Sequence, residues 1–396
     1  MPQQLVMFNK FGIKSKNITL MYLANLFGGM LFFLPIYALY LERSLFSVTN
    51  VAIIFAIEAA AMVIFEVPTG AVADLFGRKK TVISAHLIAI VGIFILYIGG
   101  SMAVFILAVL IIALARSLSS GTHNALIFDT LKEEKKEKYY KKIIGTVHAM
   151  WLIGASTGSV IGGYLASIEL GLPVLLATIP MLISAGFLFL LKEPDYEKAD
   201  HKNIFKHMLN SSKVIISNKQ LLVLLFAAFV FLAFNESVHF MNALFFEFRN
   251  IPIEWFGYIA AFTFGCSATG HYISHDVSEK FGNKTTLIIA TFMMPVLLLG
   301  AVFSPTILAV IFLSIAGIPY GIREPISEHL LNLEVHSSMR ATIISTSMLM
   351  RGLGIALVAP IVGYWADLYN VQTAFKFCGF AILSVPLIYF LLKNKK

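Results

Sequence analysis

Residues 50–80 read NVAIIFAIEAAAMVIFEVPTGAVADLFGRKK, and this stretch decides the class of fold. Its first twenty residues form a continuous apolar run that only Glu58 and Glu66 interrupt with charge. A helix needs about 20 apolar residues to cross a bilayer, whereas a membrane strand alternates apolar and polar residues. The run then ends in three basic residues, 78–80. We therefore predict a membrane-spanning helix at 50–69, followed by a charged loop.

The rest of the chain has the same apolar character. Of its 396 residues, 58% are hydrophobic and only 13% are charged, whereas soluble domains carry roughly 25% charged residues. The mean hydropathy is +0.82. Inside lipid, every backbone N–H and C=O group needs a partner within the protein, which leaves helices or a closed barrel. Because the apolar runs are continuous, we predict an all-α integral membrane protein.

Twelve such runs occur, in two groups of six. The first is longer than the apolar region of a secretory signal and no small-residue cleavage site follows it, so we expect it to be retained. The longest polar stretch, Lys192 to Lys219, separates the two groups. We expect an N-terminal six-helix bundle at 1–191, a cytoplasmic linker at 192–219 and a C-terminal six-helix bundle at 220–396. The predicted spans are 18–41, 50–69, 81–99, 102–127, 143–166, 171–191, 220–246, 255–275, 285–303, 306–330, 341–365 and 372–392.

The distribution of positive charge indicates how the spans are oriented. The net charge of +8 would suit a nucleic-acid partner, but the basic residues lie in short loops between spans. Of the 30 Lys and Arg residues, 24 fall on the side of the two termini, and only Arg43, Arg249 and Lys376 fall on the other. Lys and Arg collect on the cytoplasmic side of membrane proteins. We therefore expect cytoplasmic termini and no nucleic-acid partner. The short loops and the lack of a targeting segment favour a location in the plasma membrane, in contact with lipid.

Neither cysteine has the spacing of a metal site or a disulfide framework, because Cys266 and Cys378 both lie inside apolar runs. The sequence contains no Gly-rich phosphate loop followed by Lys-Ser or Lys-Thr. It also contains no cytosolic catalytic motif. We expect no cofactor, no metal and no enzymatic reaction, so that an ion gradient would supply any energy that the protein uses.

Short echoes relate the two groups of spans, and they favour a duplicated six-helix unit. Three echoes occur in order between corresponding spans, with offsets of 200, 205 and 207 residues. In parallel repeats of this kind the binding site lies between the halves, near mid-membrane. The echoes are Gly163-Tyr-Leu-Ala166 with Gly363-Tyr-Trp-Ala366, Phe76-Gly-Arg-Lys79 with Phe281-Gly-Asn-Lys284, and Arg116 with Arg323.

The charged loop Gly70-Ala-Val-Ala-Asp-Leu-Phe-Gly-Arg-Lys-Lys80 resembles the signature loop of the major facilitator superfamily of transporters. It departs from that signature at Leu75, where the family usually has a basic residue. The resemblance implies that the loop is a conformational latch in which Arg78 pairs with Asp129 at the cytoplasmic end of span four. The alternative is that Arg78 only marks the cytoplasmic side. The residues that carry the motif are Gly70, Asp74, Gly77, Arg78, Lys79 and Asp129.

The fifth predicted span carries glycines along one helix face. Their spacing is similar to a signature associated with antiporters of the same superfamily, except that Ser159 replaces its proline. Glycines on such a spacing also allow two helices to pack closely without any role in transport. The resemblance implies the drug/proton antiporter branch, and the alternative is a packing face. The glycines are Gly145, Gly154, Gly158, Gly162 and Gly163.

Ionisable residues within the spans are the candidates for coupling and for the cavity. Arg116 lies roughly 20 Å from the outer end of its span. A charge at that depth costs at least about 2.5–3.5 kcal/mol unless it is paired or hydrated. Arg116 with Glu58, and Arg351 with Glu324, are candidate pairs between helices; a purely structural ion pair is the alternative for each. The candidates are Glu58, Arg116, Glu236, Arg323, Glu324 and Arg351.

These patterns predict a secondary transporter that works by alternating access, as a monomer, on a small-molecule substrate. The titratable groups at depth favour proton coupling, and the glycine face favours export of amphiphilic or drug-like molecules. One alternative is a proton-coupled importer or uniporter of a nutrient with the same fold. An alternative of another class is a membrane sensor or scaffold that does not transport.

Overall fold

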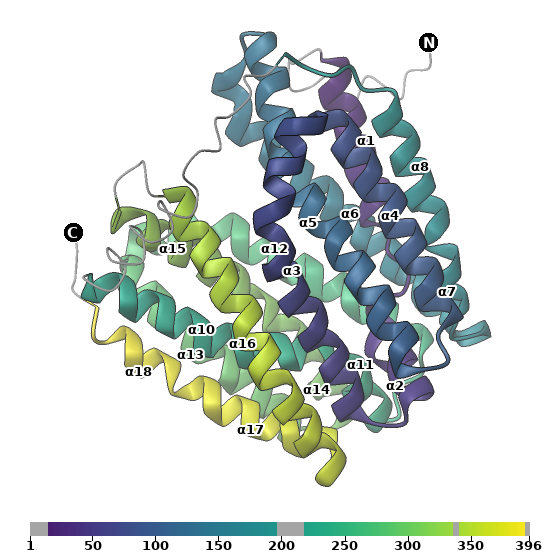
Figure 1. Ribbon diagram of the computed structural model, residues 1–396. Coiled ribbons are helices and arrows are strands. Elements are labelled where there is room, and N and C mark those ends of the chain that lie inside the picture. Colours follow the sequence, from purple (N-terminus) through teal and green to yellow (C-terminus); the bar gives the residue numbers. More distant parts are fainter. Residues whose placement is uncertain (1–14, 196–217, 336–339, 393–396) are drawn as a thin grey trace.

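The computed structural model describes residues 15–195, 218–335 and 340–392, apart from the side chains of 67–68, 70–75 and 340–345. Every regular element in these ranges is a helix. Figure 1 shows two helical bundles, one coloured purple to teal and the other green to yellow. We call residues 15–195 the N-terminal half and residues 218–392 the C-terminal half.

The N-terminal half begins with a broken helix. Its elements are α1 (Lys16–Gly29), η2 (Leu34–Ile36), α2 (Tyr37–Leu45), α3 (Val48–Phe76), α4 (Arg78–Ile98), α5 (Met102–Glu133), η3 (Glu137–Tyr139), α6 (Tyr140–Ile168), α7 (Leu172–Leu176) and α8 (Thr178–Phe189). The break between α1 and α2 precedes Pro35, whose ring fits the first turn of a helix but not its interior. The break interrupts the helix in the middle of the first predicted span.

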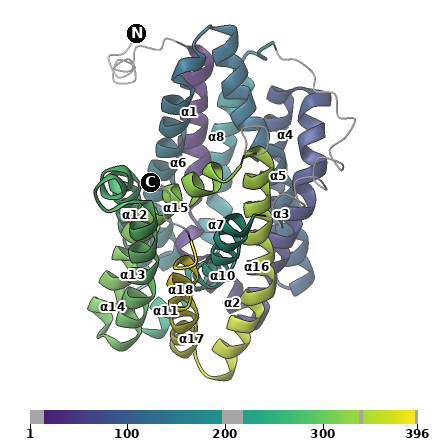
Figure 2. The ribbon, with the colours of Figure 1, turned by 90° about the vertical axis from the view of Figure 1, so that its left-hand side faces the viewer.

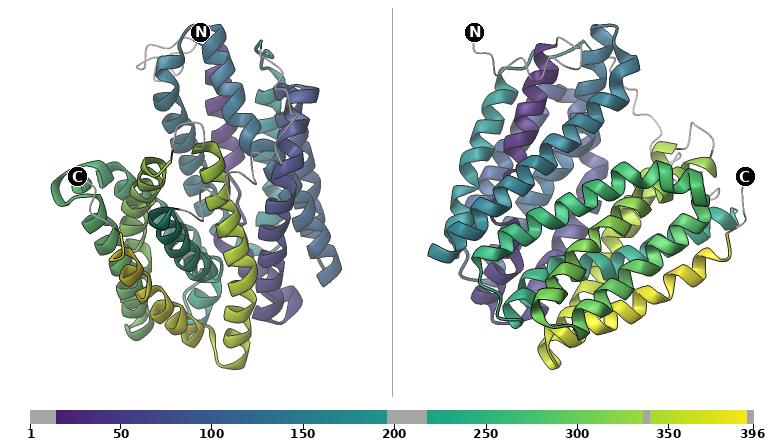
Figure 3. Two further views of the ribbon diagram at one scale, coloured as in Figure 1. Left: turned by 60° about the vertical axis from the view of Figure 1, so that its left-hand side comes forward. Right: turned by 180° about the vertical axis from the view of Figure 1, so that it is seen from behind.

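The C-terminal half contains further interrupted helices. Its elements are α10 (Lys219–Phe240), α11 (Asn242–Phe248), α12 (Glu254–Phe281), α13 (Asn283–Phe303), α14 (Thr306–Ile315), α15 (Gly317–Leu333), α16 (Arg340–Leu368), α17 (Val371–Leu383) and α18 (Val385–Tyr389). We call the end of the bundles at which α8 ends and α10 begins the linker side, and the opposite end the far side. Figures 2 and 3 show both bundles from other directions.

The prediction of an all-helical membrane fold is confirmed. Within the described ranges, eleven segments are helical, long and apolar enough to cross a membrane. The predicted span at 255–275 lies in α12, which has 28 residues and is about 42 Å long at 1.5 Å per residue. The hydropathy of α12 is lower than that of the eleven segments, because Gly, Ser, Thr, Tyr and His residues interrupt its apolar run. Length and position still suit α12 to complete a set of twelve.

One boundary was wrong in a way that matters for the site. The sequence predicted a loop from Gly70, but α3 continues as a helix to Phe76. Only Gly77 breaks the chain, with φ +98°, before α4 begins at Arg78. This backbone conformation is open to glycine and strained for other residues. The connection is therefore one tight turn between two long helices.

The two halves pack together mainly through two helix pairs, α3 with α16 and α6 with α12. The larger cluster of buried apolar residues extends across both halves and includes Phe55, Phe246 and Val362. A second cluster, which includes Met21 and Leu126, belongs to the N-terminal half alone and lies on its linker side. The shared core therefore joins the halves away from the linker side.

Candidate functional site

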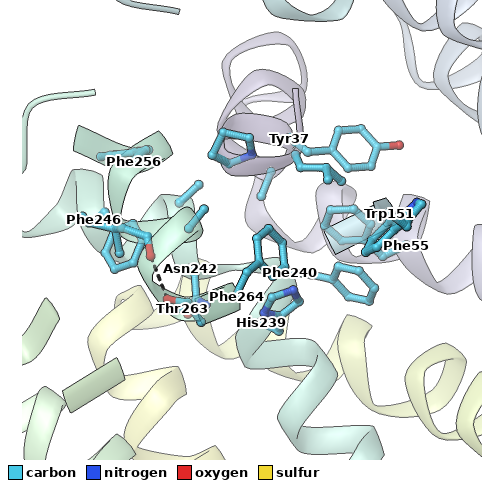
Figure 4. A pocket seen from close by; sticks show the side chains of 16 residues that line it. Tyr37, Phe55, Trp151, His239, Phe240, Asn242, Phe246, Phe256, Thr263 and Phe264 are labelled. Carbon is cyan, nitrogen blue, oxygen red and sulfur yellow. Dashed lines mark hydrogen bonds between the residues drawn. The ribbon is translucent and has the colours of Figure 1, made fainter. Parts of the chain in front are cut away.

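A cavity of about 190 Å³ lies between the two halves (Figure 4). The broken first span supplies one wall through η2 and α2, and the junction of α10 and α11 supplies the opposite wall. Helices α3, α6 and α12 complete the lining. Among its lining residues are the aromatic side chains Tyr37, Phe55, Trp151, Phe240, Phe246, Phe256 and Phe264, and the polar side chains His239, Asn242 and Thr263.

Aromatic rings from the two halves meet at this cavity. Phe55 of α3 stacks on Phe240 of α10, with ring centroids 4.6 Å apart and planes inclined by 16°. Phe246 packs edge-on against Phe256 at 5.4 Å. The cavity lies in the far half of the bundle, because Phe240 ends α10 and Phe256 is near the start of α12. The sequence could not locate it, since lipid-facing helices are equally rich in such residues.

The first ion pair lies one helical turn from the cavity, toward the linker side. The Arg116 Nη1 atom of α5 lies 2.7 Å from the Glu58 Oε1 atom of α3. The Glu58 side chain is 12% exposed and that of Arg116 is 59% exposed, although Arg116 is in the middle of a 32-residue helix. The pair also interacts electrostatically with Tyr37, which lines the cavity. The pair therefore places a largely buried carboxylate and an accessible guanidinium beside the cavity.

The C-terminal half contains a second ion pair at depth. Arg351 Nη2 of α16 lies 2.7 Å from Glu236 Oε1 of α10, and the Glu236 side chain is only 7% exposed. The suggested pairing of Arg351 with Glu324 was wrong. Glu324 instead accepts a hydrogen bond from His271 Nε2 of α12 at 3.0 Å. Tyr320 interacts electrostatically with Glu236, Glu324 and Arg351, so these groups form one cluster.

Arg323 belongs to the packed core of the C-terminal half. It is 3% exposed, its guanidinium carbon lies 3.9 Å from the centroid of the Phe231 ring, and Nη2 donates to the Tyr389 hydroxyl at 3.1 Å. None of the six predicted ionisable residues is among the residues that line the cavity. The Glu58–Arg116 and Glu236–Arg351 pairs lie in the spans beside the cavity. Arg323 is buried within the C-terminal half.

On the linker side, the tight turn at Gly77 brings charged groups together. Arg78 forms an ion pair with Asp129 at the end of α5. The Glu193 carboxylate accepts hydrogen bonds from the backbone N–H groups of Arg78 at 2.7 Å and of Lys79 at 3.0 Å. It thereby caps the positive end of α4. The sequence suggested Asp74 for a role of this kind, but the side chain of Asp74, like position 70, lies outside the described side chains.

We expect Glu193→Gln to lower the thermal stability of the purified protein by about 0.3–1 kcal/mol, because it removes the negative charge at the N-terminus of α4. The readout is the unfolding temperature in detergent. Glu169→Gln, an exposed change in the loop after α6, is the matched control. An equal unfolding temperature for Glu193→Gln and wild type would show that the cap contributes nothing.

The predicted glycine face forms close backbone contacts. A Cβ atom would lie 2.0 Å from the Leu26 carbonyl oxygen at Gly154, and 1.7 Å from the Phe32 carbonyl oxygen at Gly162. At Gly158 it would lie 2.8 Å from the Cα of Met30. These contacts hold α6 against the broken first span. Gly145 differs, since a Cβ there would meet no atom within 4 Å.

Gly163 packs against the other half of the molecule. A Cβ atom there would lie 2.8 Å from the backbone nitrogen of Gly257 in α12. Gly363, its echo in the C-terminal half, would place a Cβ atom 2.8 Å from the Val48 carbonyl oxygen in α3. The two echoes therefore form equivalent contacts on the two seams between the halves.

On the far side, Asp367 at the end of α16 joins the halves. Its carboxylate accepts hydrogen bonds from the backbone N–H groups of Val48 at 2.8 Å and Thr49 at 2.9 Å. It also accepts from the hydroxyls of Ser47 at 2.7 Å and Thr49 at 2.6 Å. Arg43 and Glu247 add an ion pair between the halves nearby. Burial raises the pKa of the Glu247 carboxyl, and the Arg43 guanidinium opposes that rise.

This far-side contact was not predicted from the sequence. Ser47-Val-Thr49 before an apolar run is a recognisable helix start, but its capping carboxylate comes from a residue more than 300 positions away. The Asp367 contact closes the far side, because it fixes the end of α16 on the start of α3.

We expect Asp367→Asn to favour opening of the far side by about 0.5–2 kcal/mol, because the amide lacks the charge and one of the two acceptor oxygens that hold the start of α3. The measurement is the rate of disulfide formation between cysteines placed at Arg43 and Glu247. Opening of the far side should make this rate lower with Asp367→Asn than without it. Both native cysteines are buried, which limits background. Asp276→Asn on the exposed face of α12 is the matched control. An unchanged rate would contradict a role for Asp367 in closure.

Comparison with known proteins identifies the family. The family model described as Major Facilitator Superfamily matches residues 18–322. The chain belongs to the major facilitator superfamily. A relative from Bacillus subtilis (strain 168), described as an uncharacterized MFS-type transporter, YxaM, is 29% identical over 203 residues. That match covers 50% of each chain, so this chain spans about half the length of the curated relative.

Solved structures of membrane transporters have the same fold. The nucleoside transporter NupG has a TM-score of 0.80 at 16% identity, covering 96% of this chain and 99% of that chain. A D-xylose-proton symporter has a TM-score of 0.76 at 12% identity, covering 96% and 98%. Identities this low show the fold alone. Membership of this superfamily places the chain among transport proteins rather than enzymes, and the resemblance to its drug/proton antiporter branch stays a prediction.

Proposed function

We propose that this chain is a secondary transporter that exports small amphiphilic molecules in exchange for protons. The observation that carries the proposal is the aromatic cavity between the halves together with the Glu58–Arg116 pair one turn away. A cavity between two repeats is where alternating access requires the substrate. A titratable carboxylate beside it can link proton binding to substrate binding, because protonation removes the charge that holds Arg116.

The described contacts support a cycle of alternating access. The far side is joined by Asp367, by the Arg43–Glu247 pair and by close packing at Gly163 and Gly363. Arg116 and Arg351 at mid-depth keep 59% and 42% of their side chains exposed. Such a cavity would be reached from the linker side. The excess of Lys and Arg on that side supports a cytoplasmic location for it.

The remaining features of the proposal follow from the sequence and the packing. The two halves act as six-helix domains of one chain, with the boundaries 1–191 and 220–396, so that a monomer contains the complete cavity. Export, rather than import, rests on the antiporter-like spacing of the glycines in α6. Four of those five glycines pack at backbone distance, which supports a structural role for the face.

Efflux from whole cells tests the proposal. Cells that express the chain are loaded with a panel of fluorescent neutral and cationic amphiphilic dyes, and efflux is followed with and without a protonophore. We expect faster efflux of at least one dye than in control cells, and loss of that difference with the protonophore. Efflux that continues without a proton gradient would contradict coupling. Net uptake driven by an inward proton gradient would support the importer instead.

A further inference from the structure

The composition of the cavity lining restricts the chemistry of its ligand. The residues that line it include seven aromatic side chains and no Asp, Glu, Lys or Arg. Its polar side chains are those of Tyr37, His239, Asn242 and Thr263. The Glu58 carboxylate, one helical turn from Phe55 on α3, is engaged by Arg116. A ligand with a fixed positive charge would gain cation–π contacts with these rings. It would find no counter-ion in the lining to offset the water that it loses, and that loss is costly in an apolar site.

The shape of the lining favours a flat ring system. Phe55 and Phe240 stack across the halves at one side of the cavity, and Phe246 and Phe256 lie at the other (Figure 4). Aromatic rings attract other rings through offset-stacked and edge-on arrangements, beyond the burial of apolar area. A planar aromatic ligand could contact rings from both halves at once, whereas a saturated ring would lose these contacts.

One polar group of the lining lacks a partner. The Asn242 side-chain oxygen is buried and accepts no hydrogen bond within the described protein. An unsatisfied buried acceptor costs about 1–3 kcal/mol, and native proteins rarely leave one without a reason. Asn242 begins α11 beside Met241, at the junction that forms one wall. Rotation of its amide, whose torsion is broad, would present the oxygen to a bound molecule.

We propose that the cavity binds an uncharged, planar aromatic molecule whose edge carries an N–H or O–H donor for Asn242. This inference rests on the proposed function, since it names the substrate class of the same cavity. It narrows that function, because lipophilic cations are excluded as preferred ligands. Phe55 and Phe240 stack on the ring system and Asn242 selects the donor.

Binding to the purified full-length protein, measured by isothermal titration calorimetry, tests the class directly. Three probes share one ring system: 6-hydroxyquinoline has the donor, 6-methoxyquinoline lacks it, and 6-methoxy-1-methylquinolinium carries a fixed positive charge. We expect 6-hydroxyquinoline to bind about two- to tenfold more tightly than 6-methoxyquinoline, the contribution of one hydrogen bond. We expect the quinolinium to bind roughly tenfold more weakly still. Equal or tighter binding of the quinolinium would overturn the inference.

Two variants test which residues contact the bound quinolines. Asn242→Leu should remove the preference for 6-hydroxyquinoline over 6-methoxyquinoline, whereas Phe240→Leu should weaken both by about two- to tenfold through lost stacking. Phe226→Leu, which changes a 56% exposed ring on the same helix, is the control and should change neither. Asn242→Leu weakening both quinolines equally would overturn the role of the amide.

The wild-type comparison of the three probes requires no variant to fold. Failure of all three to bind would overturn the ligand class. The proposed function would still stand if proton-dependent dye efflux were observed, so the two failures are distinguishable.

Discussion

Glu58→Gln is expected to reduce transport driven by a proton gradient strongly while the protein remains folded. The glutamine keeps the shape of a protonated carboxyl but cannot release a proton. We expect proton-driven flux to fall by about 5- to 150-fold, the usual range of coupling between two ligands. Arg116 loses its partner but is 59% exposed and keeps its water, so the cost to folding is small. The measurement is flux into proteoliposomes under an imposed pH gradient.

Glu66→Gln is the matched control for this substitution. Glu66 lies on the same helix, two turns closer to the linker side, and accepts a hydrogen bond from Ser120 at 3.2 Å. It should retain most of the wild-type flux. Binding of the transported dye to the Glu58→Gln protein should also persist, because Glu58 does not line the cavity. Wild-type proton-driven flux in Glu58→Gln would exclude Glu58 from the coupling step.

Gly162→Ala is expected to cause the largest loss of stability among Gly→Ala substitutions in α6. Its new methyl group would lie 1.7 Å from the Phe32 carbonyl oxygen. Because the clash is with backbone, helix α6 and the broken first span would have to separate. Overpacking of this kind costs about 1–3 kcal/mol or more. The readouts are the unfolding temperature and the fraction of protein that is monodisperse in detergent.

Gly145→Ala is the control, on the same helix with the same change of atoms. A Cβ atom there would meet nothing within 4 Å, and alanine is a better helix former than glycine by about 0.5–1 kcal/mol. We expect Gly145→Ala to leave the unfolding temperature unchanged or to raise it slightly. Similar losses for both variants would mean that the close packing of Gly162 is not what stabilises α6.

Features that depend on local sequence were predictable. Length and hydropathy predicted the helical membrane fold, since a lipid environment leaves few alternatives. The pairings of Arg116 with Glu58 and of Arg78 with Asp129 were anticipated from depth in the membrane and from the resemblance to the superfamily. Both are present in the structure.

Features that depend on helix rotation and tilt were not predictable. Spacing along α16 does not reveal whether Arg351 faces α15 or α10, so Glu236 was missed as its partner. Residue Glu193 lies in a polar stretch with no pattern, yet it caps α4. The cavity depends on where two broken helices, α1–α2 and α10–α11, come together. Single-sequence periodicity carries no information about that meeting point.

The structure explains why glycine recurs at equivalent positions of the two halves. Gly163 and Gly363 recur at an offset of 200 residues, and each packs against the opposite half. Any side chain at either position would push the halves apart on the far side. A glycine at both seams allows the same close approach twice, as a duplicated unit with approximate two-fold symmetry requires.

Proton movement coupled to substrate movement tests the central claim most directly. Purified protein is reconstituted into liposomes that contain a trapped pH-sensitive dye, and a substrate identified by the efflux assay is added outside. The account predicts that substrate entry moves protons out of the liposomes with wild-type protein, and that Glu58→Gln gives no pH change. Substrate entry at the wild-type rate with no movement of protons would contradict it.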